Sequence, residues 1–433
     1  MLDMYGDEGS KMKKMTSSEE HKNKHWKRDI IIFLSSQTFS LFGSALVQYA
    51  IMWYVTLTTK SGMMMTLFII CGFIPTFLLS PFAGVWADRF NRKNLIIIAD
   101  AMIAVVTLIL AITFLLGYKE IWLLFAIAAV RALGAGIQTP AVGAILPQIV
   151  PEDKLTKVNG INGSLQALMM FVAPIVSATL LTMATIEVIF FIDVVTAAIA
   201  IFTIAFFLKI PLHKKAADEQ TTSYLDDFKQ GLSYIKNHSF LKTFFIFFAF
   251  FFVLMAPAAF LTPLQVTRSF GDDYWRLTAI EIAFSIGMMA GGAIIASWGG
   301  FRNKVYTMTV ANLIMGVCTL VLGIVPVFWI YLAVMAVFGV AIPVFNTPTT
   351  VMLQEKVDPN YLGRIFGVFG MISTSMMPIG MLIFGPLSDI VEIEWLLVGT
   401  GVLMLVLSIF FIRNKRLVEA GLPVIKEAPV EQD

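Results

Sequence analysis

Residues 84–93 read GVWADRFNRK and form a short hydrophilic turn between two long apolar runs. The run before it, from Met63 to Phe82, carries no charged residue and is long enough to cross a bilayer, and a second such run begins at Leu95. The turn therefore joins two membrane helices. Asp88 would end the first helix, where the helix dipole disfavours a carboxylate, so it is expected to bind a cation or another helix N-terminus. Gly84 would permit close approach of a neighbouring helix.

Composition indicates a polytopic membrane protein. Of 433 residues, 58% are hydrophobic and 14% are charged, which is too apolar for an ordinary soluble domain. Cys71 and Cys318 both fall inside apolar runs, so the sequence shows no disulfide framework or metal-ligand set. The apolar runs predict twelve membrane helices, at about residues 30–57, 62–87, 94–116, 121–146, 155–182, 186–208, 240–266, 277–298, 305–325, 328–352, 364–388 and 393–412.

The basic residues predict the orientation of these helices. If the N-terminus is cytoplasmic, all but five of the 31 Lys and Arg residues fall on the inner side. The five exceptions are Arg131 within a span and, in outer loops, Lys60, Lys119, Arg268 and Arg276. By the positive-inside rule both termini are expected to be cytoplasmic. Residues 1–29 contain no short apolar segment, so no cleavable signal peptide is apparent.

A polar linker divides the chain into two sets of six spans. Its second part, Tyr224 to Ile235, has apolar residues near helical spacing and predicts an amphipathic helix at the inner interface. Each half has a Thr-Pro pair at the same interval before another proline: Thr139-Pro140 before Pro151, and Thr347-Pro348 before Pro359. This repeat favours two related bundles around a central cavity. The expected organisation is a cytoplasmic tail at 1–29, bundles at 30–208 and 240–412, the cytoplasmic linker at 209–239 and a cytoplasmic tail at 413–433.

The turn at 84–93 resembles the signature loop between the second and third membrane helices of the major facilitator superfamily. The resemblance covers nearly all of residues 30–412. It implies an all-α fold of twelve transmembrane helices in two pseudo-symmetric six-helix bundles. Three stretches are similar to the macrolide-efflux branch of drug:proton antiporters: RALGAGIQTPAVGAILPQIVPEDKL (131–155), IEIAFSIGMMAGG (280–292) and LQEKVDPNYLGRIFGVFG (353–370).

This branch resemblance implies a secondary active transporter of a bacterial cell membrane. Such a protein exports amphiphilic drugs such as macrolides by proton antiport with alternating access, with the proton gradient as its energy source and no cofactor. The chain departs from the pattern at the antiporter signature, where Ala173-Pro174 stands in place of the usual Gly-Pro. The residues matching the cytoplasmic latch, with a partner at the start of helix eleven, are Gly84, Asp88, Arg89, Arg92, Lys93 and Arg364.

Ionisable side chains inside spans are costly, so each suggests a functional role with a partner. Arg131 lies near the middle of the fourth span and is expected to face the central cavity, although a structural bond to backbone carbonyls is the alternative. Glu281 lies near the outer end of the eighth span and is expected either to carry a proton as a half-buried carboxylate or to be an outer-rim residue in water. Asp193 and Asp100 are expected mainly to satisfy buried polar groups or helix ends, with proton coupling as their alternative role.

The resemblance implies a substrate cavity formed by helices one, four, seven and ten. Amides, aromatic rings and Met side chains on those helices could orient an amphiphile against an adaptable apolar surface. The candidates are Gln37, Gln48, Tyr49, Trp53, Gln138, Phe247, Phe251, Met255 and Asn346.

Other functions fit the sequence less well. No span holds a His, no nucleophile–base pair is visible and the phosphate-binding Gly-x-x-x-x-Gly-Lys-Ser/Thr loop is absent, which argues against an enzyme and against direct use of ATP. Export of an endogenous metabolite such as a siderophore, or uptake of a nutrient, stays the alternative within transport. The expected partners are a small amphiphilic substrate and the lipid bilayer, without nucleic acid, and the expected state is a monomer.

Overall fold

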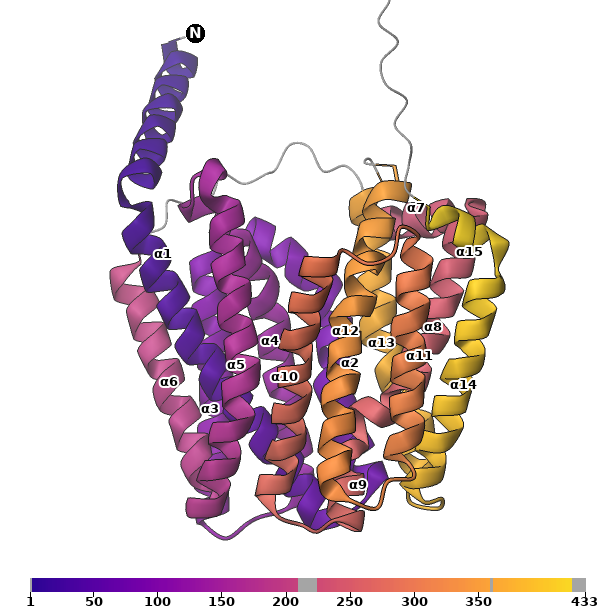
Figure 1. Ribbon diagram of the computed structural model, residues 1–433. Coiled ribbons are helices and arrows are strands. Elements are labelled where there is room, and N and C mark those ends of the chain that lie inside the picture. The colour runs from indigo at the N-terminus through magenta and orange to yellow at the C-terminus, as the bar shows by residue number, and fades with distance from the viewer. Residues whose placement is uncertain (1, 209–223, 359–360, 423–433) are drawn as a thin grey trace, which may run out of the picture. The chain divides into compact units, whose positions relative to one another are not determined.

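The structure is a computed structural model that describes residues 2–208, 224–358 and 361–422 (Figure 1). For residues 2–24, 80–81, 84–85, 88–89, 152, 156 and 224–229 it describes the backbone alone. Within the described ranges the secondary structure is helical, and twelve segments are long and apolar enough to cross a membrane, which confirms the predicted fold class.

The chain divides into two compact units, Met1–Tyr54 with Leu67–Gln220, and Val55–Thr66 with Thr221–Asp433. The first unit contains the larger parts of α1 (Leu2–Thr59) and α2 (Gly62–Arg89). It also contains the whole of α3 (Arg92–Leu115), α4 (Ile121–Ile149), α5 (Leu155–Met183) and α6 (Ile186–Phe207). The second holds α7 (Tyr224–Asn237), α8 (Ser239–Phe260), α9 (Thr262–Ser269), α10 (Tyr274–Trp298), α11 (Lys304–Leu322), α12 (Phe328–Lys356), α13 (Leu362–Leu387), α14 (Ile393–Arg413) and α15 (Lys415–Ala420).

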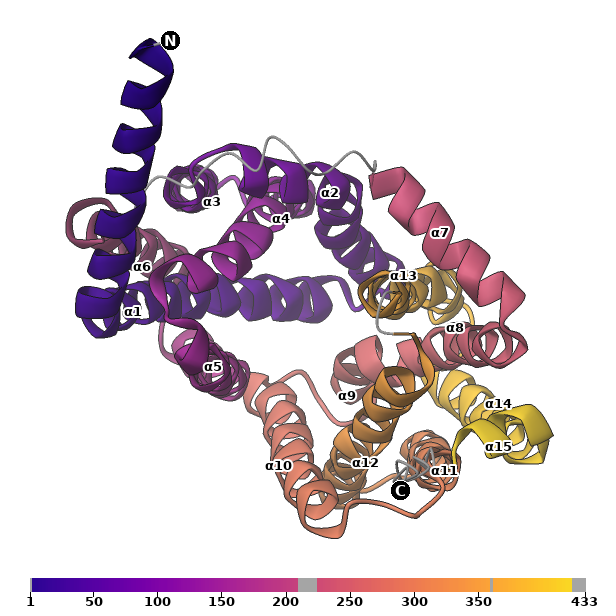
Figure 2. The same ribbon diagram turned by 90° about the horizontal axis from the view of Figure 1, so that it is seen from above.

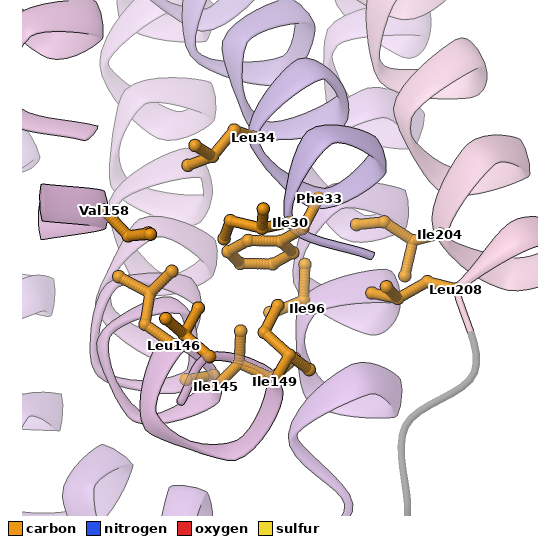
Figure 3. Close-up of a cluster of buried hydrophobic side chains, with 12 residues drawn as sticks. Ile30, Phe33, Leu34, Ile96, Ile145, Leu146, Ile149, Val158, Ile204 and Leu208 are labelled. Carbon is orange, nitrogen blue, oxygen red and sulfur yellow. The ribbon is translucent and has the colours of Figure 1, made fainter. Parts of the chain in front are cut away.

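The core of the first unit is aliphatic at the end where α6 finishes (Figure 3). Phe33 of α1 is fully buried there and is surrounded by branched side chains from α3, α4 and α6. These are Ile96, Ile145, Ile149, Ile204 and Leu208. Their burial fixes the ends of four helices against one another.

The core of the second unit is aromatic. Phe247 of α8 stacks on Phe411 of α14 with ring centroids 3.9 Å apart, and Phe251 stacks on Phe345 of α12 at 4.5 Å. Phe248 lies 5.4 Å from Phe345. Offset and edge contacts of this kind add to the packing of each ring, so this cluster joins α8, α12 and α14 into one rigid body.

Both units repeat the same helix packing. Within each unit, the third membrane helix packs against the fourth and the sixth. In the first unit α3 packs against α4 and α6, and in the second α11 packs against α12 and α14 (Figure 2). Asn91 and Asn303 begin these third helices as N-caps, each accepting a hydrogen bond from the backbone N–H two residues on. The shared packing supports the internal duplication that the Thr-Pro pairs indicate.

Three element boundaries differ from the sequence expectation. The span expected at 240–266 breaks at Leu261 into α8 and α9, because Pro263 near the start of α9 cannot continue the hydrogen bonding of the preceding helix. Helix α1 begins at Leu2 rather than near residue 30, since the polar stretch before its span is rich in Lys, Glu and Met, which favour helix. Part of the expected C-terminal tail forms α15, whose Val418 carbonyl accepts a hydrogen bond from Asn303.

The outward surface of the helices is strongly apolar. Met183, Trp329 and Ile390 are 81%, 70% and 85% exposed, and many Ile, Leu and Phe side chains accompany them. Exposed apolar patches of this extent mark a surface that meets lipid. The segment expected to form an amphipathic helix is helical in the structure, as α7 (Tyr224–Asn237), while residues 209–223 of the linker lie outside the described ranges.

Candidate functional site

An ion pair between α4 and α6 lies inside the first unit. Arg131 Nη1 is 2.5 Å from Asp193 Oδ2, and it also donates a hydrogen bond to Thr107 Oγ1 on α3. Arg131 Nη2 is 3.4 Å from the backbone oxygen of Ser44 on α1. The Arg131 and Asp193 side chains are 10% and 1% exposed, so the two buried charges neutralise each other. We call these four residues the ion-pair layer.

This placement differs from the expectation that Arg131 faces a central cavity. Its guanidinium points into the bundle of α1, α3, α4 and α6, where Asp193 is its partner. The close approach of α1 depends on Gly43, because a β-carbon there would overlap Thr196 Oγ1 and lie 2.9 Å from Asp193 Oδ1. The expectation that Asp193 satisfies a buried polar group agrees with this contact.

A second polar cluster lies two helical turns away on the same helices. Asp100 Oδ1 accepts hydrogen bonds from Ser40 Oγ at 2.8 Å and from Gln138 Nε2 at 2.7 Å. Asp100 Oδ2 is buried and has no hydrogen-bond partner among the described residues. We call Asp100, Ser40 and Gln138 the carboxyl layer. Gln138 was expected to contact substrate, but it is 8% exposed and is engaged with Asp100.

The two layers follow from the register of α3 against α4. Asp100 and Thr107 are separated by two turns on α3, and Arg131 and Gln138 by two turns on α4. Because consecutive helices run in opposite directions, Thr107 meets Arg131 while Asp100 meets Gln138. This matching interval is the sequence signal that could have identified Asp100 as a site residue beside Arg131.

The second unit fills the corresponding positions with uncharged residues. Counting from the caps Asn91 and Asn303, Asp100 corresponds to Asn312 and Thr107 to Thr319. When the Thr-Pro pairs of α4 and α12 are aligned, Arg131 corresponds to Gly339. Helices α6 and α14 both begin with Ile-Glu, and aligning these starts makes Asp193 correspond to Thr400. Asn312 is fully buried and donates to Ser408 Oγ at 2.7 Å.

Glu281 is isolated from these layers. It lies on α10 and is partly buried. It makes no hydrogen bond or ion pair with another described residue. The structure thus brings Arg131 and Asp193 together but leaves Glu281, the third residue expected to take part in proton coupling, in the other unit.

The residues expected to contact substrate are divided by burial. Phe247 and Phe251 are 1% and 2% exposed inside the aromatic core, so they do not line an open cavity in this structure, contrary to the expectation. Helix α8 is phenylalanine-rich on every face, and its sequence therefore could not show which rings are buried. Buried as well are Gln37, Trp53 and Met255, at 3%, 0% and 8% exposure.

Two polar candidates are exposed. Gln48 on α1 and Asn346 on α12 present their side chains at the surface of their units. Tyr49 is half-buried, and its ring centroid lies 5.4 Å from that of Trp53. These three residues keep the accessibility that a substrate contact requires.

The residues expected to form the latch are described in part. For Gly84, Asp88 and Arg89 the structure describes the backbone alone. Arg92 donates to the backbone oxygens of Ala87 and Ala144, at 2.8 and 2.7 Å. A cation near the carbonyl ends of α2 and α4 complements their dipoles.

The two remaining latch candidates also have defined contacts. Lys93 donates to the backbone oxygens of Ala205 and Leu208, both at 2.8 Å, at the end of α6. Arg364 in the second unit lies over the Tyr361 ring at 5.4 Å. Lys93 therefore ties together helix ends of the first unit.

Sequence reasoning missed a cap at the start of α2. Asp389, between α13 and α14, accepts hydrogen bonds from the backbone N–H groups of Gly62 and Met63 at 2.7 and 2.9 Å and from Ser61 Oγ at 2.7 Å. Arg268 Nη2 lies 2.8 Å from Asp389 Oδ1. A carboxylate at a helix N-terminus is favourable. We call these five residues the Asp389 clasp.

The clasp changes the titration of its carboxylate. Burial alone would raise the pKa of Asp389, but the hydrogen bonds from Ser61, Met63, Gly62 and Arg268 outweigh it and hold the pKa below its ordinary value. Nearby, a hydrogen bond from Lys60 lowers the pKa of the exposed Asp272. Both carboxylates are therefore charged at neutral pH.

Comparison with known proteins identifies the family of this chain. The sequence profile of the Major Facilitator Superfamily matches residues 30–381. Macrolide efflux protein A of Streptococcus pyogenes is 29% identical over 390 residues, which cover 90% of this chain and 96% of that protein. The protein of the same name from Enterococcus faecalis is 29% identical over 312 residues, covering 72% of this chain and 96% of its own length.

A solved structure shows the same fold. The crystal structure of a bacterial homolog of the human lysosomal transporter Spinster, in its inward-facing and unoccupied conformation, superposes with a TM-score of 0.68 at 12% identity. It covers 94% of this chain and 99% of its own. These relatives are transporters and not enzymes, as the sequence led us to expect. The chain belongs to the Major Facilitator Superfamily and is a multi-pass membrane transporter.

Proposed function

We propose that this transporter exports amphiphilic compounds such as macrolides from a bacterial cell in exchange for protons. The observation that carries the proposal is the similarity to Macrolide efflux protein A over nine-tenths of the chain. The proton gradient supplies the energy without a cofactor, and the protein acts as a monomer. Both termini lie in the cytoplasm, in keeping with the basic residues on the tail side of the spans.

Transport proceeds by alternating access between inward-open and outward-open states. Two units with the same internal helix packing supply the two bundles that such a cycle uses. Within each unit, tightly packed helices keep the bundle rigid, as the ion-pair layer does in the first and the aromatic core in the second. Gln48, Tyr49 and Asn346 are the side chains we assign to substrate contact.

The turn at 84–93 acts as the latch of this cycle. Asp88 supplies the carboxylate of the latch and Arg364 is its candidate partner from the sequence, while Arg92 and Lys93 bind backbone oxygens at helix ends of the first unit. The variant Asp88→Asn keeps the shape of the side chain and removes its charge. It should be produced at the wild-type level in the membrane and should fail to export, and normal export by that variant would refute the latch.

The direct test of the proposed function is accumulation in cells with and without the protein. A radiolabelled macrolide and the fluorescent amphiphile ethidium are measured before and after an uncoupler collapses the proton gradient. Lower accumulation in producing cells that rises on uncoupling is the expected result. If neither compound differs between the two strains, drug export is rejected, and export of an endogenous metabolite or nutrient uptake becomes the leading function.

A further inference from the structure

We propose that Asp100 is the proton-binding residue of the transporter and carries the proton exchanged for substrate. This inference rests on the proposed proton-coupled export and deepens it by naming the coupling site. Asp100 lies on α3 and is 1% exposed. The ion-pair layer two turns away already contains its own counter-charge.

The hydrogen bonds of the carboxyl layer identify the protonated oxygen. Both donors, Ser40 Oγ and Gln138 Nε2, point at Oδ1, which therefore acts as the carbonyl oxygen of a carboxylic acid. Oδ2 receives no hydrogen bond from a described residue although it is buried. An ionised carboxylate spreads its charge over both oxygens, and leaving one of them without a donor in an apolar interior is costly. The neutral acid, with its proton on Oδ2, fits this arrangement.

The charged groups around Asp100 do not offset a negative charge on it. On α4 the facing cation is Arg131, which is bound to Asp193 of α6. On α1 the facing group is the hydroxyl of Ser40. On α3 itself, Lys93 donates to carbonyl oxygens at the end of α6. Among the described side chains, Arg131 is already paired with the carboxylate of Asp193. A negative charge on Asp100 would therefore have no cation of its own.

The second unit provides an internal comparison. At the position that corresponds to Asp100 it has Asn312, an uncharged side chain of nearly the same shape that is also fully buried on a third helix. Asn312 donates to Ser408 Oγ and Met404 O of α14, so a neutral polar group serves the packing role at this position. Asn312 Oδ1, like Asp100 Oδ2, is buried without a hydrogen-bond partner among the described residues, but the amide is always neutral, so of the two residues Asp100 alone can hold a proton there.

The step at Asp100 is a simple proton transfer. The O–H bond at Oδ2 breaks and the proton passes to water that reaches the layer in the inward-open state, leaving a carboxylate that keeps its two donors on Oδ1. In the outward-open state the carboxylate takes a proton from outer water and becomes neutral again. One proton enters the cell per cycle, with no oxidation or reduction. The carboxylate exists only while water solvates the layer, because burial favours the neutral form.

Two measurements on Asp100→Asn test the proposal, with Asp153→Asn as the matched control because Asp153 is exposed and pairs with Lys154 outside both layers. The first is infrared spectroscopy of the purified protein, in which the carbonyl-stretch band of a protonated carboxylic acid should disappear in Asp100→Asn and persist in Asp153→Asn. An unchanged band in Asp100→Asn overturns the proposal whatever the substrate is.

The second measurement is ethidium transport by proteoliposomes. Accumulation driven by an imposed pH gradient should fall at least tenfold in Asp100→Asn, whereas exchange of ethidium without a gradient should persist. Accumulation within twofold of wild type overturns the assignment of coupling to Asp100. If the wild-type protein itself shows no gradient-driven transport, the proposed function fails, while the infrared result still decides whether Asp100 holds a proton.

A folding defect does not block the test. If Asp100→Asn aggregates on size-exclusion chromatography, Asp100→Glu keeps the carboxyl group and should move the infrared band rather than remove it. In that variant the pH at which gradient-driven transport is half-maximal should also shift, because the longer side chain leaves the donors of Ser40 and Gln138. A pH profile identical to the wild-type profile overturns the proposal.

Discussion

The two units share a helix packing but have different residues at the matching buried positions. The first unit has Arg131, Asp193 and Asp100, and the second has Gly339, Thr400 and Asn312. The first unit therefore has a buried ion pair and a buried carboxyl group at these positions, whereas the second has uncharged residues there and packs through the rings of Phe247, Phe251 and their neighbours. The two units thus share a helix packing but differ in the chemistry of the matching positions.

The largest effect is expected where the buried charge of the first unit is left unpaired. Arg131→Met should destabilise the protein by about 3–5 kcal/mol, because Asp193 stays buried without its cation. Adding Asp193→Leu makes this layer neutral, as it is in the second unit, and should recover most of the loss. The apparent Tm in detergent reports both variants. A double variant no more stable than Arg131→Met would show that the pair has no net coupling.

A somewhat smaller effect is expected in the aromatic core of the second unit. Phe251→Ala should cost about 3 kcal/mol through lost ring contacts and a cavity. Phe250→Ala is the matched control, since that ring is 60% exposed, and it should leave the apparent Tm nearly unchanged. The pH profile of ethidium transport per folded molecule should match the wild-type profile in both variants. Equal losses in the two variants would contradict the placement of the aromatic core.

The Asp389 clasp predicts a pH-dependent effect of intermediate size. Asp389→Asn should lower stability by about 1–2 kcal/mol at neutral pH, because a charged cap of α2 is lost. Since the folded-state pKa of Asp389 is depressed, its contribution is complete above the unfolded carboxyl pKa and is lost as pH falls through the lower folded value. Melting curves of both proteins should therefore converge in acid. A difference that persists in acid would indicate a role of shape rather than charge.

The smallest effect is expected at the matching helix caps. Asn91→Ala and Asn303→Ala should each cost about 1 kcal/mol. Asn303→Ala should cost more, because Asn303 Nδ2 also donates to Val418 O of α15. Asn303→Asp separates the two roles, since it keeps the capping oxygen and removes the donor to α15. Equal Tm values for the Asn91 and Asn303 alanine variants would contradict a contribution from α15.

The sequence predicted the helices well because each span carries its own signal. Local apolar length predicts the first residues of α4 and α12, at 121 and 328, while the helices end three and four residues later than expected. The partner of Arg131 was harder to predict, because Asp193 is 62 residues away in sequence and lies on another helix. The burial of Phe247 could not be read from α8, where rings occur on every face and no period separates lipid from core. The Asp389 clasp depends on two loops distant in sequence, and neither loop carries a motif for the other.

The assignment of residues 55–66 to the second unit has a topological consequence. Thr66 Oγ1 donates to the Met381 carbonyl, and a β-carbon at Gly385 would overlap Thr66, so this short segment is fitted tightly against α13. The polypeptide therefore passes from one unit to the other and back before α2 is complete. The first unit is therefore discontinuous in sequence, because residues 55–66 of the second unit lie between its two segments. Two fragments cut between residues 209 and 223 should reassemble when produced together, because the first fragment carries a piece that the second needs to fold.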